Sequence, residues 1–179
     1  MSHRVATPDD GAGLAAIYAP IVRDTVISFE SRPPDAAEMG RRVAATLPTH
    51  PWLVWEEGGA VLGYAYAGPH RVRPAYAWAV EVSAYVHASV RRRGIARQLY
   101  AAVLEILDQQ GYRRVLAGIT LPNEASVGLH ERLGFAPVGV YRAVGFKAGR
   151  WHDVGWWQRS LGEGDSTVPG VPPTRFDTL

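Results

Sequence analysis

Cysteine is absent from the 179-residue sequence. Disulfide bonds, zinc sites built on thiolates and a cysteine nucleophile are therefore all excluded. Long hydrophobic runs are absent as well, because no apolar stretch approaches the roughly 18 residues that a membrane span needs. The first ten residues, MSHRVATPDD, also lack the apolar core of a signal peptide. We expect a cytoplasmic protein with no membrane partner.

Net charge is also small, at +2, within an ordinary globular composition of 47% hydrophobic and 20% charged residues. A protein that binds nucleic acid without sequence preference usually presents a broad basic face. Here the arginines gather in local clusters instead, at Arg71 and Arg73, at Arg91–Arg93 and at Arg113–Arg114. Local clusters suit a small anionic ligand, and we expect no nucleic-acid partner.

The periodicity of apolar residues predicts a mixed α/β (α+β) domain with a central sheet. Residues 1–161 form a single domain in this interpretation, and the Pro/Gly-rich residues 162–179 form an extended or partly ordered tail. The pattern lacks the regular βαβ alternation of a doubly wound fold. The expected elements are helices over 7–25 and 31–51, a hairpin over 51–68, a strand over 78–87, a helix from 95 to 111, a strand over 115–119, a helix over 123–135, and two final strands over 135–146 and 151–161.

The segment WAVEVSAYVH, residues 78–87, has the clearest strand pattern. Its small apolar residues alternate with polar ones, so that one face of the strand is apolar and the other polar. The polar set consists of Glu81, Ser83, Tyr85 and His87. A carboxylate half-buried on such a face can take up a proton near neutral pH, which suits a general base. A solvated glutamate on an edge strand is the alternative.

The strand runs into VRRRGIARQL, a basic turn with Gly94 followed by a helical stretch. The first turn of a helix has unpaired amide hydrogens and a positive partial charge, and glycine lets a phosphate approach them closely. The segment lacks the second glycine and the lysine of a Walker loop, and the Gly-x-Gly-x-x-Gly of a Rossmann turn. A cradle for a pyrophosphate is the favoured interpretation, and a solvated basic turn is the alternative.

Two motifs resemble the GCN5-related N-acetyltransferase (GNAT) family. Arg91, Gly94 and Ala96 match its Arg/Gln-x-x-Gly-x-Gly/Ala motif, and LPNEASVGLHERLGF resembles its second half-motif, Asn-x-x-Ala/Ser before a helix ending in Leu-Gly-Phe. The segments FESRPP, PWLVWEEGGAVLGYAYAGPHRVRPAYAW, VEVSAYV and RAVGFKAGRWHDVGWWQ are similar to the branch of phosphinothricin and methionine sulfoximine N-acetyltransferases. The similarity is collinear over about residues 4–161.

This resemblance implies the GNAT fold, with a mostly antiparallel sheet whose strands splay, often at a bulge, beside acetyl-CoA. It implies a homodimer that acetylates the α-amino group of a small amino acid such as phosphinothricin, with acetyl-CoA as co-substrate and no metal. Glu81 is then the general base. His130 stands where many family members have a tyrosine, and its role as general acid or as a second base is open. The implied cofactor-binding residues are Tyr85, Val86, His87, Arg91, Arg92, Arg93, Gly94, Ile95, Ala96, Arg97, Gln98, Asn123 and Ser126.

For Asn123, a helix cap is an alternative or additional role. The implied substrate-binding residues are Phe29, Arg71, Arg73, Tyr76, Ser83 and Tyr85. Arginine pairs well with carboxylate or phosphinate oxygens, and Arg71 and Arg73 lie on one side of an extended segment. Solvation of a loop is the alternative for these two arginines.

Three other functions stay open at this point. A GNAT enzyme for peptide N-termini or polyamines is the first, although a polyamine site favours carboxylates over Arg71 and Arg73. A non-catalytic module that senses acetyl-CoA is the second. An RNA-binding domain that uses the arginine turn is the third, and it predicts binding with a steep salt dependence.

Overall fold

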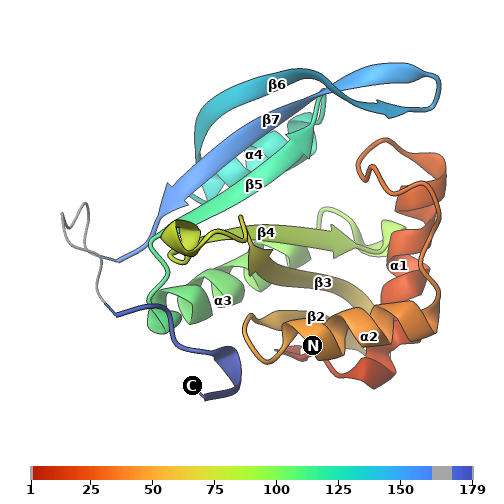
Figure 1. The fold of residues 1–179 in the computed structure, drawn as a ribbon. Coiled ribbons are helices and arrows are strands. Elements are labelled where there is room, and N and C mark those ends of the chain that lie inside the picture. Colours follow the sequence, from red (N-terminus) through yellow and green to blue (C-terminus); the bar gives the residue numbers. More distant parts are fainter. Residues whose placement is uncertain (1, 163–170, 179) are drawn as a thin grey trace.

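A single seven-stranded sheet organises the computed structural model, which describes residues 2–162 and 171–178 (Figure 1). The strand order is β1-β2-β3-β4-β5-β7-β6, antiparallel except for the parallel pair of β4 and β5. This confirms the expected fold class. The elements are β1 (Ser2–Val5), α1 (Gly11–Asp24), α2 (Ala36–Thr46), β2 (Trp52–Glu57), β3 (Ala60–Pro69), β4 (Ala79–Val86), α3 (Ile95–Gln110), β5 (Arg114–Thr120), α4 (Glu124–Arg132), β6 (Ala136–Lys147) and β7 (Arg150–Ser160).

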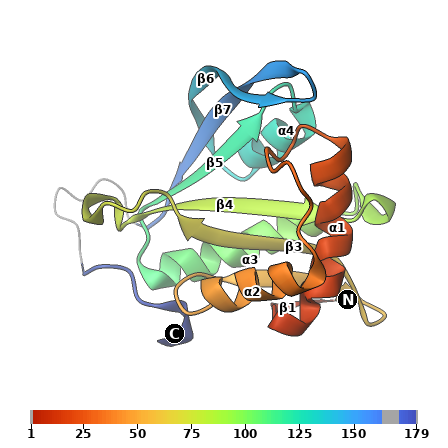
Figure 2. The ribbon, with the colours of Figure 1, turned by 45° about the vertical axis from the view of Figure 1, so that its right-hand side comes forward.

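The expected alternation along β4 is confirmed, because its two faces belong to different cores. Val80 and Val82 are buried in the core cluster that contains Leu99 and Val103 of α3. Tyr85 packs instead against the cluster built by α1 and α2. Helices α1 and α2 therefore cover one face of the β1–β4 half of the sheet and α3 covers the other, as Figures 1 and 2 show.

Strand β1 was not expected, because the charged and polar residues at its start give little apolar pattern. It pairs with Leu53–Glu56 of β2 and widens the sheet at one edge. The first helix also starts later than expected, since Pro8–Asp10 form a separate 3₁₀ turn before α1. Helix α2 is shorter than the expected 31–51, since it begins after Asp35, whose side chain caps it by accepting from the Glu38 amide.

Residues 163–170 and 179 of the expected tail lie outside the described residues. Residues 171–178 lie against the domain, where the Thr174 amide donates to the Gln110 carbonyl at 2.8 Å. Gln110 Nε2 donates in return to the Thr174 carbonyl at 2.7 Å. The domain boundary at residue 161 stays a prediction.

Two features of the described residues bear on possible partners. No helix in them is long and apolar enough to cross a membrane. They also contain no group of three or more His, Cys, Asp or Glu residues arranged to hold a metal ion.

Candidate active site

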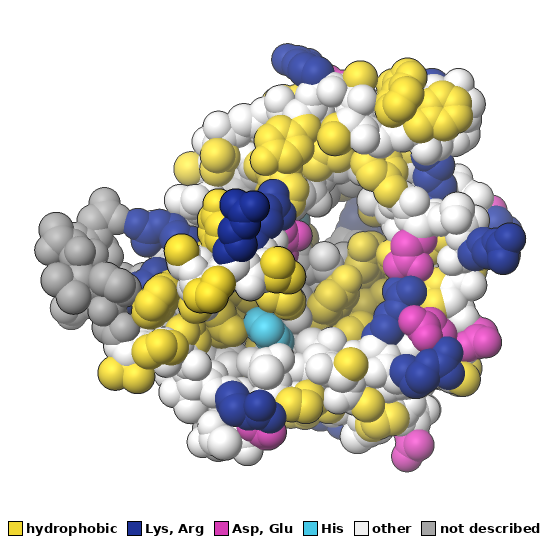
Figure 3. Space-filling model, viewed as in Figure 1, with side chains coloured by type: hydrophobic (Ala, Val, Ile, Leu, Met, Phe, Trp, Pro, Cys, Tyr) yellow, Lys and Arg dark blue, Asp and Glu magenta, His cyan; other side chains and the backbone are white. Residues whose placement is uncertain are grey.

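Strands β4 and β5 separate soon after they meet. They pair only where Ala79–Glu81 lies beside Arg114–Leu116, and beyond that point they diverge (Figure 1). A cavity of about 60 Å³ opens between them, and the space-filling view shows a hollow through this region (Figure 3). The lining residues are Ile27, Val82, Ser83, Ala84, Tyr85, Tyr100, Ala117, Gly118, Ile119, Thr120, Asn123, Ser126 and His130.

The lining includes four consecutive residues from each of the two strands. Consecutive residues of a strand point to opposite faces, so a cavity that touches four in a row lies along the strand edge. The gap thus exposes strand edges whose backbone groups lack a neighbouring strand. The expected splaying of the sheet is confirmed.

The resemblance also predicts a bulge in β4, and this prediction is wrong for the pairing of β4 with β3. The register between the two strands runs without a shift from Gly63 opposite Val86 to Pro69 opposite Val80. The splay arises because β5 turns away, while β4 stays paired with β3.

This register also corrects the prediction for His87, which the resemblance implies as a cofactor-binding residue: its backbone amide cannot bind the cofactor. The His87 amide donates to the Leu62 carbonyl at 2.9 Å, so it does not point into the gap. Residues of an antiparallel pair alternate between bonding to the partner and facing away from it. By that alternation Tyr85 also bonds toward β3, and Val82, Ala84 and Val86 turn their backbone groups toward the gap.

The basic turn lies just beyond the end of β4 and starts α3. Arg91, Arg92, Arg93 and Gly94 are exposed, and Ile95 beneath them is 3% exposed and belongs to the core. Gly94 adopts the left-handed conformation at φ 76°, and Arg92 has φ 63°. A Cβ built on Gly94 would meet only the Gln98 side chain, at 4.0 Å, so the space above this backbone is open.

The arginines of this turn are not equivalent. Arg93 makes an ion pair with Glu57 at 2.9 Å, which holds it toward the β2–β3 hairpin. The first turn of α3 carries no acidic side chain that would neutralise the amide hydrogens. Ala96, Arg97 and Gln98 complete this turn, and Arg97 and Gln98 are exposed.

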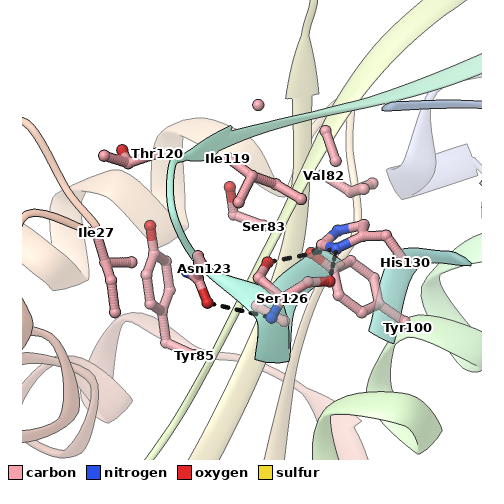
Figure 4. A pocket seen from close by; sticks show the side chains of 13 residues that line it. Ile27, Val82, Ser83, Tyr85, Tyr100, Ile119, Thr120, Asn123, Ser126 and His130 are labelled. Carbon is pink, nitrogen blue, oxygen red and sulfur yellow. Dashed lines mark hydrogen bonds between the residues drawn. The ribbon is translucent and has the colours of Figure 1, made fainter. Parts of the chain in front are cut away.

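Helix α4 supplies the far wall of the gap, where Asn123, Ser126 and His130 face Ser83 and Tyr85 of β4 (Figure 4). Asn123 Oδ1 accepts from the Ser126 amide at 3.2 Å, which confirms the helix-cap role. The cap uses only the oxygen of the side-chain amide, so its nitrogen is left as a donor at the cavity wall.

His130 is 4% exposed and lies between two aromatic rings, Tyr100 and Phe135. Its Nδ1 lies 2.8 Å from the Ser126 carbonyl, and that oxygen only accepts, so Nδ1 carries the proton. The other nitrogen, Nε2, then accepts from the Tyr100 hydroxyl at 3.2 Å. Burial lowers the pKa of His130, so its imidazole is held neutral. Sequence reasoning missed Tyr100, because only the fold brings α3 beside α4.

Glu81 is the last β4 residue that pairs with β5, directly before the cavity begins at Val82. Its side chain is 35% exposed, and its Oε1 lies 2.7 Å from His70 Nδ1. The same oxygen is 3.6 Å from Arg71 Nη1. His70 was also missed, since a lone histidine after a strand gives no signal in the sequence.

The expected substrate residues do not all line this cavity, and Arg71 lies beside Glu81 at the closed end of the gap. Ser83 and Tyr85 line the cavity. Burial raises the pKa of Tyr85 well above its ordinary value, so it remains a neutral phenol. Tyr76 contacts the His70 ring at 5.8 Å between centroids, and its amide donates to the Arg73 carbonyl at 2.9 Å. The Arg73 side chain makes no hydrogen bond or ion pair within the part of the chain that the structure describes.

Phe29 is 40% exposed and lies on the loop between α1 and α2, which also brings Ile27 to the cavity. Its ring packs directly on Gly145 of β6, where any side chain would collide with it. Lys147 ties the same loop to β6, because its Nζ donates to the Val22 carbonyl at 2.7 Å and the Ser28 carbonyl at 2.6 Å. The hairpin of β6 and β7 therefore fixes the position of Phe29.

Residues 4–156 match the family model of the acetyltransferase (GNAT) domain. The chain is 41% identical over 169 residues to phosphinothricin N-acetyltransferase of Streptomyces viridochromogenes, covering 94% of this chain and 90% of that protein. It is 34% identical over 164 residues to the L-methionine sulfoximine/L-methionine sulfone acetyltransferase of Salmonella typhimurium, covering 91% and 96%. The crystal structure of a GNAT superfamily phosphinothricin acetyltransferase from Sinorhizobium meliloti with AcCoA superimposes with a TM-score of 0.91 at 36% identity, covering 98% and 96%.

Proposed function

The chain belongs to the GNAT acetyltransferase family, and from this membership we propose that it is an acetyl-CoA-dependent N-acetyltransferase for a small amino acid. The proposed acceptor is the α-amino group of a compound such as phosphinothricin, L-methionine sulfoximine or methionine sulfone. One observation carries the proposal: the β4–β5 gap has Glu81 at its closed end and a cationic helix start beyond the other end of β4.

The open end of this gap suits acetyl-CoA. The exposed turn of Arg91–Gly94 offers arginine side chains and unpaired amides of α3 to the pyrophosphate. Val86 turns its backbone toward the gap, where it can bond the pantetheine arm. Asn123 supplies a side-chain donor from the opposite wall. Acetyl-CoA brings the activated acetyl thioester, and these residues orient it along the strand edge.

The region around Glu81 suits an amino acid with an anionic side group. Arg71 lies beside Glu81, Arg73 follows on the same exposed loop, and both can pair with carboxylate or phosphinate oxygens. Phe29, fixed by its contact with Gly145, covers the apolar part of the substrate. Ser83 and Tyr85 line the inner part of the site, and both are neutral donors or acceptors.

The acceptor amine is mostly protonated at neutral pH, because the pKa of an α-amino group is about 7.7–8. We assign the removal of this proton to the Glu81 carboxylate. The nitrogen then attacks the thioester carbon, the C–N bond forms, the C–S bond breaks, and the thiolate takes up a proton. Buried His130 is neutral with no proton on Nε2, which argues against the role of general acid. Nε2 already accepts from the Tyr100 hydroxyl, so a share in base work would require that hydrogen bond to be exchanged.

The rival functions fit these observations less well. A polyamine carries several positive charges, which Arg71 beside Glu81 and the neighbouring Arg73 would repel. A module that only senses acetyl-CoA has no need of a carboxylate held at the closed end of the gap. An RNA-binding domain would need more basic surface than one short turn, in which Arg93 is already paired with Glu57.

We also propose that the protein is a homodimer that contacts its partner through β6. This edge strand of the sheet exposes Val138, Tyr141, Val144 and Phe146, and neighbouring β7 exposes Trp151 at 63%. An apolar edge strand of this kind is usually covered. A cytoplasmic location stays a prediction from the sequence, and a role in resistance to a toxic amino acid stays a prediction from the proposed substrates.

The Glu81→Gln variant tests the proposal, because it keeps the shape of the side chain and removes its basicity. We expect thiol release from acetyl-CoA with phosphinothricin to fall by about 10²- to 10⁴-fold, while the affinity for CoA stays within about twofold. Glu105→Gln, the same change on the exposed face of α3, should leave both unchanged. If the wild-type protein binds CoA tightly but releases no thiol with any amine, the result would favour the non-catalytic module that senses acetyl-CoA.

A further inference from the structure

His70 is the closest partner of the carboxylate assigned as general base. It follows directly after the end of β3, at the point where Gly68 pairs with Glu81 across the two strands. Its Nδ1 lies 2.7 Å from Glu81 Oε1, which is the short distance of a charge-assisted hydrogen bond. The contact joins the end of one strand to the functional side chain of the next.

Two aromatic rings hold the imidazole in place. Tyr76 meets it edge-on at 5.8 Å between centroids, with an interplanar angle of 75°. Trp156 of β7 meets it at 5.9 Å and 76°. The His70 side chain is only 13% exposed, against 35% for Glu81. The histidine is therefore the fixed member of the pair, and the glutamate, with three rotatable bonds, is the member that needs to be held.

The bond also decides which oxygen of Glu81 is left for the substrate. An ionised carboxylate only accepts hydrogen bonds, so His70 Nδ1 must carry the proton. Arg71 approaches the same oxygen, Oε1, at 3.6 Å. Among the residues that the structure describes, none donates a hydrogen bond to Oε2. One oxygen is anchored and the other is available to receive a proton.

We infer that His70 is a positioning residue, which anchors Glu81 through Oε1 so that Oε2 meets the incoming amine. This role rests on the proposed function, in which Glu81 removes the proton of the amine. Because Arg71 is assigned to the anionic oxygens of the substrate, His70 is the partner that Glu81 keeps during turnover.

The test compares three substitutions that differ in where they place an N–H donor. The side-chain nitrogen of His70→Asn is as many bonds from Cα as Nδ1, so it can donate to Oε1. The nitrogen of His70→Gln is one bond further out, and His70→Ala has none. We expect kcat to fall by about 10- to 100-fold in His70→Ala and His70→Gln, with the KM for acetyl-CoA unchanged, and to recover most of that loss in His70→Asn. A thermal melt of each variant serves as the control for folding.

Equal losses in His70→Asn and His70→Ala would overturn the inference, because they would show that the ring acts by packing between Tyr76 and Trp156. Wild-type kcat in all three variants would overturn it as well. The double variant with Glu81→Gln separates this inference from the proposed function. If Glu81→Gln lowers kcat by the expected factor and His70→Ala lowers it no further in that background, both ideas are supported. If Glu81→Gln retains full activity, the base assignment fails and the positioning role fails with it.

Discussion

Replacing Gly94 with alanine tests the phosphate cradle, because it adds one methyl group to the backbone at the start of α3. Gly94 has φ 76°, a conformation that costs an L-residue about 1–2 kcal/mol. For a chain of this size, each kcal/mol lowers the melting temperature by about 2–4 °C. In the protein alone the methyl group meets only Gln98, at 4.0 Å, so steric strain adds little to this cost. With a phosphate on the turn, the same methyl group would occupy the space of the ligand.

The loss of one backbone hydrogen bond to a charged group costs about 1.5–3 kcal/mol, which corresponds to an affinity for CoA weaker by about 10- to 150-fold. Gly59→Ala is the matched control, because Gly59 has φ 79°, also has open space around it, and lies in the β2–β3 turn. We expect both variants to lose similar melting temperature and only Gly94→Ala to lose CoA affinity, as measured by calorimetric titration. A Gly94→Ala variant that binds CoA as tightly as Gly59→Ala would refute the cradle.

Three further predictions concern the pocket and its pH dependence. Because burial lowers the pKa of His130, the unfolded chain binds a proton there that the folded chain excludes, so the free energy of unfolding should fall as the pH drops below about 6.5. In thermal melts between pH 7.5 and 5.5, the stability of His130→Gln should fall less than that of the wild type. An equal fall in the two proteins would contradict the assignment. Gly145→Val should displace Phe29 and raise the KM for the amine without changing that for acetyl-CoA, whereas Gly139→Ala, in open space on the same strand, should change neither. Arg73→Ala should raise the KM for phosphinothricin by about tenfold, and Arg73→Lys should restore part of it, since lysine lacks the bidentate geometry; an unchanged KM in Arg73→Ala would remove this residue from the site.

The parts of the fold that could be predicted from sequence are those with a strong local pattern. The alternation along β4 identified its two faces, and the periodic stretch ending at Gly111 identified α3, which stops there with the glycine in the left-handed conformation. The family motifs placed Gly94 and Asn123 at the starts of two helices, where the structure has them. Each of these signals lies within a short segment, so no knowledge of tertiary contacts was needed.

The parts that could not be predicted depend on contacts between distant segments. His70 reaches Glu81 only because β3 and β4 pair in one register, and Tyr100 reaches His130 only because α3 and α4 pack together. Strand β1 is too short and too polar to give a pattern. The direction of each backbone amide along β4 likewise follows from the register with β3, which no sequence motif encodes.

The most direct test of the account is thiol release from acetyl-CoA with a panel of amines. The panel contains phosphinothricin, methionine sulfoximine, methionine sulfone, ordinary amino acids, spermidine and a short peptide, and mass spectrometry identifies the acetylated nitrogen. We predict turnover confined to the first three compounds, with acetyl on the α-nitrogen and one thiol released for each product. Turnover only with spermidine or the peptide would contradict the assignment of Arg71 and Arg73 to substrate binding. No turnover with any amine would contradict the proposal that the protein is an N-acetyltransferase.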